Sequence, residues 1–382
     1  MSRIPVMRPW FGPEEAEAVA AAVSSGWVAQ GPRVAEFEQA FARRVHADDG
    51  VAVSNCTTGL HLALVLAGLG AGDEVVVPSL SFIASTNVVR YVGAQPVFAD
   101  VDLATQNLTV ATVEAVLTAR TRAVVAVHQG GVPLDLDPLR DFCAARGLAL
   151  IEDAACAIGS TYRGRPIGEG ARYAAFSFHP RKLLTTGEGG MLVSDDPALA
   201  IRGRRLREHG MNVSAAARHG SDRVVLEEYS EVGFNYRMTD MQAALGLVQL
   251  SKLDAMVARR RELATRYQEA LADVDGIVTA TDPEFGTTNY QSFWVLLHED
   301  FPVGRDELLQ TLLDQGISAR RGIMAAHCEP AYADHPHAPL PVTERLTHGS
   351  VILPVYHDLS AQDQDRVIDV LLRVCAGTPM PA

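Results

Sequence analysis

Short apolar strands alternate with helical patterns between about residues 50 and 210, and this alternation constrains the fold more than any other feature. The predicted strands are apolar along their whole length, so both of their faces must be covered. Repeated β–α alternation of this kind gives a mainly parallel sheet with helices on both sides. The predicted strands are 51–54, 74–77, 96–99, 123–127, 148–151, 174–178 and 190–193. The last two have no long helix between them, which indicates a mixed sheet.

A second, smaller α/β domain is expected after this region. A long helix is predicted over 241–270, capped at Thr239 or Asp240, and such a helix often bridges two domains. Further strands near 292–297 and 351–353 and helices near 306–315 and 360–375 follow it. With about 150 residues per domain, we expect two domains in 382 residues. We expect a large domain over 1–245, including an N-terminal segment over 1–30, and a small C-terminal domain over 246–382.

Composition excludes several classes of protein. The chain has 33 basic and 46 acidic residues, a net charge of −13, which disfavours nucleic acid and anionic membranes as partners. No apolar run is long enough to cross a bilayer, and no signal peptide is recognisable, so we expect a soluble, cytoplasmic protein. Five cysteines without a Cys-x-x-Cys spacing argue against a disulfide framework or a zinc site, and no metal is expected.

Polar residues directly follow several predicted strands, where ligands bind in an open parallel sheet. The turn 54–59, Ser-Asn-Cys-Thr-Thr-Gly, leads from a strand into a helix whose free amides could cradle a phosphate. Glu152 and Asp153 follow the strand 148–151, and a carboxylate there can pair with a ring nitrogen. In both cases the alternative is a simple helix or loop cap.

Lys182 lies just after the predicted strand 174–178 and before the glycine-rich turn 185–190. Burial would lower the pKa of this lysine and free its amine as a nucleophile, although a lone lysine is usually solvated. Phe82 could stack on a planar cofactor or belong to the core. Pyridoxal 5′-phosphate (PLP) needs a bonded lysine, an anion beside its ring nitrogen and a phosphate cup. Lys182, Asp153 and the turn 54–59 supply these three parts.

The chain resembles the DegT/DnrJ/EryC1/StrS family of sugar aminotransferases, which are PLP-dependent enzymes of fold type I. The resemblance runs from Arg8 through the final helix. The stretches that carry it are 25–32, 72–78, 151–155, 176–182, 187–190 and 233–238. It implies a large domain with a mixed, mostly parallel seven-stranded sheet flanked by helices, and a smaller C-terminal α/β domain.

The resemblance also implies roles for individual residues. Lys182 would bond to the cofactor and then shuttle the proton, and Asp153 would pair with the pyridine nitrogen. Phosphate contacts would come from Thr57, Thr58 and Ser177, ring stacking from Phe82, and a contact with the sugar from His327. Apart from the resemblance, Arg320 and Arg321 follow a predicted strand of the small domain and are candidates to meet the substrate's diphosphate. Trp27, in an N-terminal loop, and Glu188 are further candidates for substrate contacts. Asn235 would reach the phosphate of the neighbouring subunit's cofactor, which implies a homodimer with shared active sites.

Two cysteines depart from the family pattern. Cys156 stands where the family commonly has Gln or His to hold the ring, and cysteine is a poor hydrogen-bonding residue. We expect Cys156 to pack on the ring face. Cys56 stands where glycine is more common, so the phosphate turn must accommodate a side chain. The arginines of the group 202–207 are expected on a solvated helix face or at a subunit contact.

The predicted reaction transfers the amino group of L-glutamate, through PLP and pyridoxamine phosphate (PMP), to a nucleotide-linked keto-deoxysugar. A keto-cyclitol is an alternative acceptor. A sugar dehydratase of the same family would carry His where Lys182 stands, and a non-catalytic PLP-binding regulator could lack the lysine. A nicotinamide dehydrogenase is disfavoured because its glycine fingerprint is missing.

Overall fold

The computed structural model describes residues 3–213 and 222–380. Within these ranges the strands form sheets of seven, four and three strands. The seven-stranded sheet contains β1 (Asp49–Val53), β2 (Glu74–Pro78), β3 (Gln95–Ala99), β4 (Thr121–Val127), β5 (Ala149–Asp153), β8 (Ala174–Ser177) and β9 (Gly190–Ser194). Its order is β1-β9-β8-β5-β4-β2-β3. β9 runs antiparallel to β1 and β8, and the other neighbours are parallel, so the predicted mixed sheet is confirmed.

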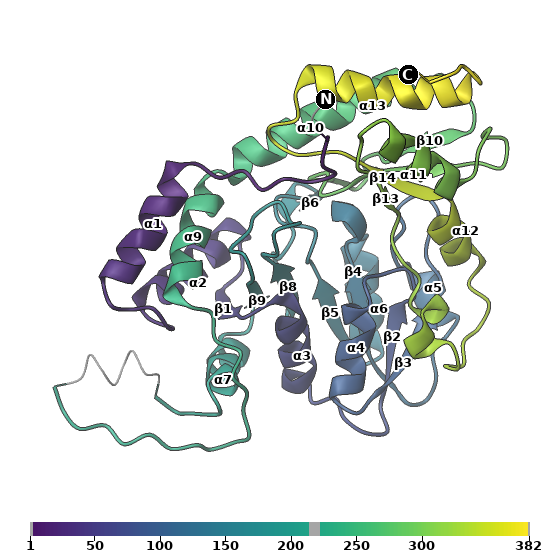
Figure 1. Cartoon of the computed structure of the whole chain (residues 1–382). Helices are drawn as coiled ribbons and strands as arrows, with labels where there is room; N and C mark the ends of the chain where they lie inside the picture. The colour runs from purple at the N-terminus through teal and green to yellow at the C-terminus, as the bar shows by residue number, and fades with distance from the viewer. Residues whose placement is uncertain (1–2, 214–221, 381–382) are drawn as a thin grey trace.

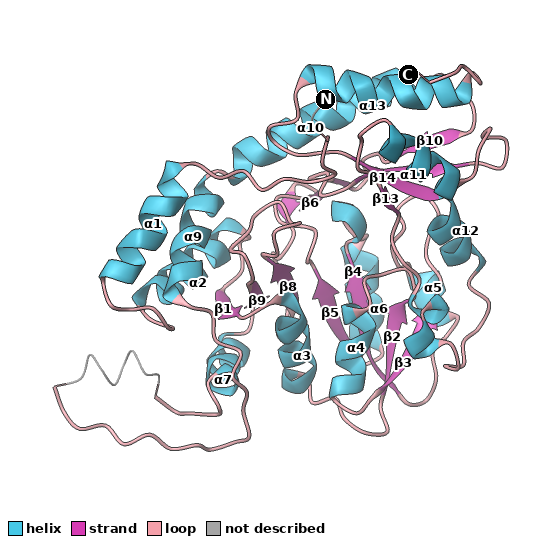
Figure 2. Ribbon diagram, in the orientation of Figure 1, coloured by secondary structure: helices cyan, strands magenta, loops and turns pink. Residues whose placement is uncertain are grey.

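Helices cover both faces of this sheet (Figure 2). They include α2 (Pro32–Arg44), α3 (Cys56–Leu66), α4 (Ala84–Tyr91), α5 (Val110–Glu114), α6 (Leu136–Ala145) and α7 (Pro197–Arg207). α1 (Pro13–Ser24) lies farther out, against the helix formed by Asp240–Ser251. Side chains of one strand alternate between two apolar cores: Val76 packs into one, and Val75 and Val77 into the other. All three are fully buried. Coverage on both sides explains why these strands read as continuous apolar runs.

The C-terminal part is built on the four-stranded sheet, ordered β10-β12-β14-β13. Its strands are β10 (Ile277–Thr279), β12 (Phe293–Leu297), β13 (Arg320–Arg321) and β14 (Ser350–Leu353). α9 (Asp240–Ser251) packs against α1 and α2, beside the large sheet. The helices that accompany the four-stranded sheet are α10 (Leu253–Leu271), α11 (Arg305–Asp314), α12 (Pro341–Gly349) and α13 (Ala361–Cys375). α10 and α13 lie side by side above this sheet (Figure 1).

Smaller elements connect the two parts. β11 (Gly286–Thr287), from the C-terminal half, pairs with β6 (Thr161–Tyr162), which in turn pairs with β7 (Arg165–Pro166). The short 3₁₀ turns are η1 (Gln129–Gly131), η2 (Ala326–Cys328) and η3 (Pro330–Tyr332). Among the described residues, no helix is long and apolar enough to cross a membrane.

The expectation of one helix over 241–270 is wrong, because two consecutive helices meet at Lys252. The Lys252 amide bonds to the Gln249 carbonyl three residues back, which tightens the last turn of α9. Its ammonium lies 2.7 Å from a carboxylate oxygen of Glu15 in α1. This long-range contact holds the junction. The division expected at residues 245/246 falls inside α9 and stays a prediction.

Asp240 joins the start of α9 to the start of α2. Its buried carboxylate accepts hydrogen bonds from the backbone amides of Gly31 at 2.8 Å, Arg33 at 3.1 Å and Val34 at 3.0 Å. Amides in the first turn of a helix have no partner within the helix. Thr239 caps α9 itself through the amide of Gln242, as one of the two predicted caps. A single carboxylate therefore holds two helix starts together.

Asp240→Ala should lower the free energy of unfolding by about 3 kcal/mol, because buried amides lose a charged acceptor. Urea denaturation followed by circular dichroism measures this change. The matched control is Asp254→Ala, which removes an exposed carboxylate paired with Arg44 and should cost under about 0.5 kcal/mol. Equal losses in the two variants would contradict the role given to Asp240.

Candidate active site

Lys182 and Asp153 lie at the same edge of the large sheet. β5 and β8 are parallel neighbours, with Asp153 paired to Ala175, so the chain leaves both strands at one edge. Asp153 is the last residue of β5, Cys156 lies in the turn that follows, and Lys182 lies in the loop after β8. The Lys182 amine donates a hydrogen bond to the Cys156 sulfur at 3.0 Å. The structure thus brings together the residues predicted to bond the cofactor and to face its ring.

The Asp153 carboxylate is buried and held in one orientation. Its Oδ2 accepts a hydrogen bond from the Ser85 hydroxyl at 2.7 Å, and its Oδ1 accepts one from the Ala155 amide at 3.1 Å. Ser85 belongs to α4 and contacts the Ser81 hydroxyl at 2.8 Å. The sequence analysis missed Ser85, because only the packing of α4 brings this hydroxyl to the carboxylate.

The pKa of Lys182 moves opposite to the prediction. Burial lowers this pKa, as expected, but the neighbouring Cys156 sulfur and the Asp153 carboxylate raise it more, so the net direction is upward. The prediction considered desolvation alone and was wrong about the charge. At neutral pH and without cofactor, Lys182 is an ammonium group.

Gln291 braces the loop that carries Lys182. Its Oε1 accepts a hydrogen bond from the Leu183 amide at 2.7 Å, and its Nε2 donates one to the Arg181 carbonyl at 2.6 Å. The loop is therefore fixed on both sides of Lys182. Gln291 precedes β12 and is far away in sequence, and no motif signalled it.

The N-terminus of α3 lies at this edge and suits an anion. Asn55 caps the helix by accepting the Thr58 amide at 2.9 Å, and the Thr58 hydroxyl donates to the Asn55 carbonyl within the same cap. The first-turn amides of Cys56 and Thr57 remain available for a phosphate. A Cβ on Gly190 would lie 2.7 Å from the Cys56 nitrogen, so only glycine lets β9 approach this turn.

The contacts of Cys56 and Ser177 indicate that the turn 54–59 lies close to Lys182. Burial raises the pKa of Cys56 well above its ordinary value; Asp153 raises it further and Lys182 lowers it. Ser177 ends β8, and its hydroxyl accepts from the His179 amide at 3.4 Å. A buried carboxylate, a lysine and an anion-binding helix start thus meet at one edge. These residues fit the three parts of PLP.

Only two lysines occur in the chain, Lys182 and Lys252. Lys252 is held by Glu15 at the junction of α9 and α10. Since PLP bonds to a lysine in such enzymes, Lys182 stays the predicted point of attachment. This count can be read from the sequence alone.

The remaining predicted site residues occupy different surroundings. Phe82 is 66% exposed in the loop after β2. Asn235 is exposed and forms a β-bridge with Glu208, next to Tyr236, whose carbonyl accepts the Ser54 amide. Trp27 is half-buried against Gly31. None of these contacts involves Lys182 or Asp153, so their roles stay predictions.

Two predicted substrate residues lie closer to the lysine loop. The Glu188 carboxylate is exposed and lies 4.0 Å from the His179 ring. Arg320 is exposed on β13; burial lowers its pKa, and the positive charges of Arg181 and Arg321 lower it further. Arg320 therefore lies near enough to Arg181 for the two positive charges to act on each other.

His327 is enclosed rather than open. Its Nδ1 lies 2.6 Å from the Ser79 hydroxyl, and its Nε2 lies 3.6 Å from Glu344. Burial lowers the pKa of His327, and neighbouring His337 lowers it further. The Ala326 amide also bonds to the Ser79 carbonyl. His327 thus connects η2 to the loop after β2, and its predicted contact with the sugar remains untested.

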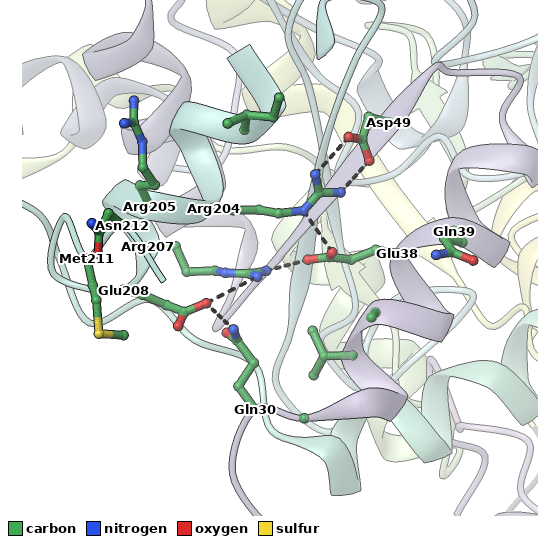
Figure 3. A pocket seen from close by; sticks show the side chains of 14 residues that line it. Gln30, Glu38, Gln39, Asp49, Arg204, Arg205, Arg207, Glu208, Met211 and Asn212 are labelled. Atoms are coloured by element: carbon green, nitrogen blue, oxygen red, sulfur yellow. Dashed lines mark hydrogen bonds and ion pairs between the residues drawn. The ribbon is translucent and has the colours of Figure 1, made fainter. Parts of the chain in front are cut away.

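A hollow of about 560 Å³ lies elsewhere, between α2, β1 and α7 (Figure 3). There Arg204 pairs with Glu38 and Asp49, and Arg207 with Glu38 and Glu208. The positive and negative charges balance, and the lining contains neither Lys182 nor Asp153, so we do not assign catalysis to it. Arg207 is buried, so for this residue the expectation of a solvated helix face is wrong. A subunit contact by the arginine group stays a prediction.

The model of the DegT/DnrJ/EryC1/StrS aminotransferase family matches residues 10–372. The chain belongs to this family. It is an α/β aminotransferase, and its fold agrees with solved members over almost its whole length. The aminotransferase TlmJ from Streptoalloteichus hindustanus is 38% identical, with a TM-score of 0.90 over 98% of this chain and 99% of that chain.

Two further solved structures bear on cofactor and substrate class. DesI, solved in the presence of its TDP-sugar product, is 34% identical, with a TM-score of 0.88 over 99% of this chain and 94% of that chain. Spr1654 of Streptococcus pneumoniae was solved in a PLP form, at 26% identity and a TM-score of 0.91 over 99% of this chain and all of that chain. It was also solved in a PMP form. The residues of this site therefore fit the cofactor of the family.

Glu152, beside Asp153, belongs to a buried ion network. Successive strand residues point to opposite faces, so Glu152 points away from the site. It bonds to Arg140 at 2.7 Å and lies 3.5 Å from His128. Burial raises its pKa, but His128 and Arg140 outweigh burial, so the pKa of Glu152 is lowered.

The pKa of Glu152 is lower in the folded protein than in the unfolded chain. Its negative charge therefore stabilises the fold at pH values above the ordinary pKa range of glutamate. This stabilisation is lost as the pH falls through the lowered value. Glu152→Gln should therefore weaken the fall in unfolding free energy between about pH 5 and pH 3. Urea titrations at several pH values test this. Glu36→Gln, which removes a carboxylate from the exposed Arg33 pair, is the control. An unchanged acid slope in Glu152→Gln would refute the role.

Proposed function

We propose that this aminotransferase moves the amino group of L-glutamate to a keto group of a nucleotide-linked deoxysugar, using PLP and PMP. The observation that carries this proposal is the meeting of Lys182, Asp153 and the α3 N-terminus at one sheet edge. Family membership supports the reaction class. The TDP-sugar product seen with DesI supports the sugar acceptor.

The residues of the chain divide the work as follows. Bound PLP supplies an electron sink for the substrate's carbanion. Asp153, oriented by Ser85 and the Ala155 amide, would pair with the ring nitrogen and favour its protonated form. The Lys182 Nζ would anchor the cofactor and, when free, accept and return the substrate's proton. The amides of Cys56 and Thr57, with Ser177, would hold the phosphate.

Arg320 is proposed to meet the substrate's diphosphate. It is exposed beside Arg181, and two guanidinium groups match the charge and shape of phosphate oxygens. Phe82 is proposed to stack on the ring of PLP, and Cys156 to lie against it. Trp27, Glu188 and His327 are proposed to border the sugar site.

We also propose a homodimer in which Asn235 reaches the other subunit's phosphate. The segment 222–232 extends from the body and exposes large apolar side chains (Figure 1). Val224 is 91% exposed, Val232 89% and Leu226 81%. So many exposed apolar side chains on one segment are typical of an interface. A second copy of the chain is the proposed partner.

With PLP added, the purified protein should absorb visible light, and L-glutamate should bleach this band as PMP forms. Borohydride reduction should leave the cofactor on Lys182, as seen by peptide mass spectrometry. Lys182→Ala should lose the band and reduce turnover at least about 10³-fold. The control is Lys252→Arg, which removes the only other lysine but keeps the pair with Glu15, and should behave as wild type.

Product analysis with a nucleotide keto-sugar and a keto-inositol, offered side by side, tests the acceptor. Amination of the keto-sugar is the expected result. Amination of the keto-inositol alone would contradict the sugar acceptor and identify a keto-cyclitol as the acceptor instead. A visible band that L-glutamate leaves unchanged would overturn the proposed donor.

Mixing inactive Lys182→Ala with inactive Asn235→Ala tests the shared site. A mixed dimer holds one site with an intact Lys182 from one chain and an intact Asn235 from the other. After subunit exchange, activity should return to about a quarter of wild type, since half of the dimers are mixed and each has one intact site. No recovery despite exchange, checked by mass spectrometry of intact dimers, would place Asn235 in its own subunit's site.

A further inference from the structure

The contact between Lys182 and Cys156 is the closest polar contact of the lysine amine in the structure. The Nζ donates to the Sγ at 3.0 Å, and the turn that carries Cys156 is fixed by Asn289, which donates to the Cys156 carbonyl at 2.8 Å. The sulfur is therefore held at the amine by the backbone. A cysteine can ionise, which a glutamine at this position could not do.

Other groups around the amine have different partners. The Asp153 oxygens accept from Ser85 and from the Ala155 amide. Cys56, from α3, is buried, and its thiol donates to the Ala175 carbonyl at 3.6 Å. His179 lies three residues before Lys182 and accepts the Arg181 amide on its ring nitrogen. Among these groups, the Cys156 sulfur is the one that accepts a hydrogen bond from the Lys182 amine.

We propose that Cys156 is a positioning residue that holds the free Lys182 as a thiolate–ammonium pair. When Lys182 must act as a base, one N–H bond breaks and one S–H bond forms, so the proton passes from Nζ to Sγ. The reverse transfer restores the pair. This use in turnover rests on the proposed function, whereas the pair itself exists without cofactor.

Such a pair has a chemical signature, because a thiolate is alkylated far faster than a thiol. The chain's other cysteines supply internal controls. Cys328 is exposed, but burial and the carboxylates of Glu344 and Glu329 raise its pKa. Cys143 is buried, and burial raises its pKa to about 11. Cys156 is only half-buried, so a small reagent can reach it.

The experiment treats the cofactor-free full chain with iodoacetamide at pH 7.5 and follows each cysteine by peptide mass spectrometry. Cys156 should react at least about tenfold faster than the more exposed Cys328. In Lys182→Met the Cys156 rate should fall about tenfold, and in Lys182→Arg, which keeps the positive charge, it should be largely restored. Lys252→Arg is the matched control and should leave the rate unchanged.

Two results would overturn the proposal: a Cys156 no faster than Cys328, or a rate in Lys182→Met equal to that of wild type. A second measurement uses the PLP-loaded protein, in which a negative sulfur favours protonation of the lysine nitrogen. In Cys156→Ser the pH midpoint of the visible band should fall by about one unit. An unchanged pH midpoint in Cys156→Ser would also contradict the proposed thiolate–ammonium pair. Fast Cys156 alkylation together with no response to L-glutamate would refute the proposed reaction and leave the pair intact.

Discussion

The parallel pairing of β5 with β8 is the constraint on which the site depends. It sends the chain out of both strands at one edge, so Asp153 and the loop of Lys182 emerge side by side. β9 then returns antiparallel, and its Gly190 allows the α3 N-terminus to approach the same edge. A carboxylate, a lysine and a set of free amides are thereby assembled from three separate segments of the chain, around residues 56, 153 and 182. The apolar cores on both faces of the sheet keep this geometry rigid.

Charge at this edge is set by neighbours more than by burial. Burial lowers the pKa of Lys182, yet the Cys156 sulfur and the Asp153 carboxylate raise it more. Ser85 and the Ala155 amide orient Asp153, and Gln291 holds the lysine loop from the C-terminal part of the chain. The C-terminal part thus contributes to the site through this brace.

Local pattern predicted the strands of the large sheet, its mixed character and the residues at the strand ends, because continuous apolar runs and polar turns are local properties. It failed where distant contacts decide. The helix over 241–270 is broken at Lys252, which an ion pair with Glu15 ties to α1. The arginines of α7 were expected on a solvated face or at a subunit contact, but Arg207 is buried and paired with Glu38 of α2.

The sequence by itself determined the fold class, the family and the identity of the central pair, Lys182 and Asp153, because strand periodicity and ordered motifs are written along the chain. The chain has two lysines, and Lys182 is the one in the motif predicted to bond the cofactor. Only the tertiary structure decided the charge of Lys182, its contact with Cys156 and the partners of Asp153. These depend on distances between side chains from different strands and helices, and no spacing along the chain encodes such distances.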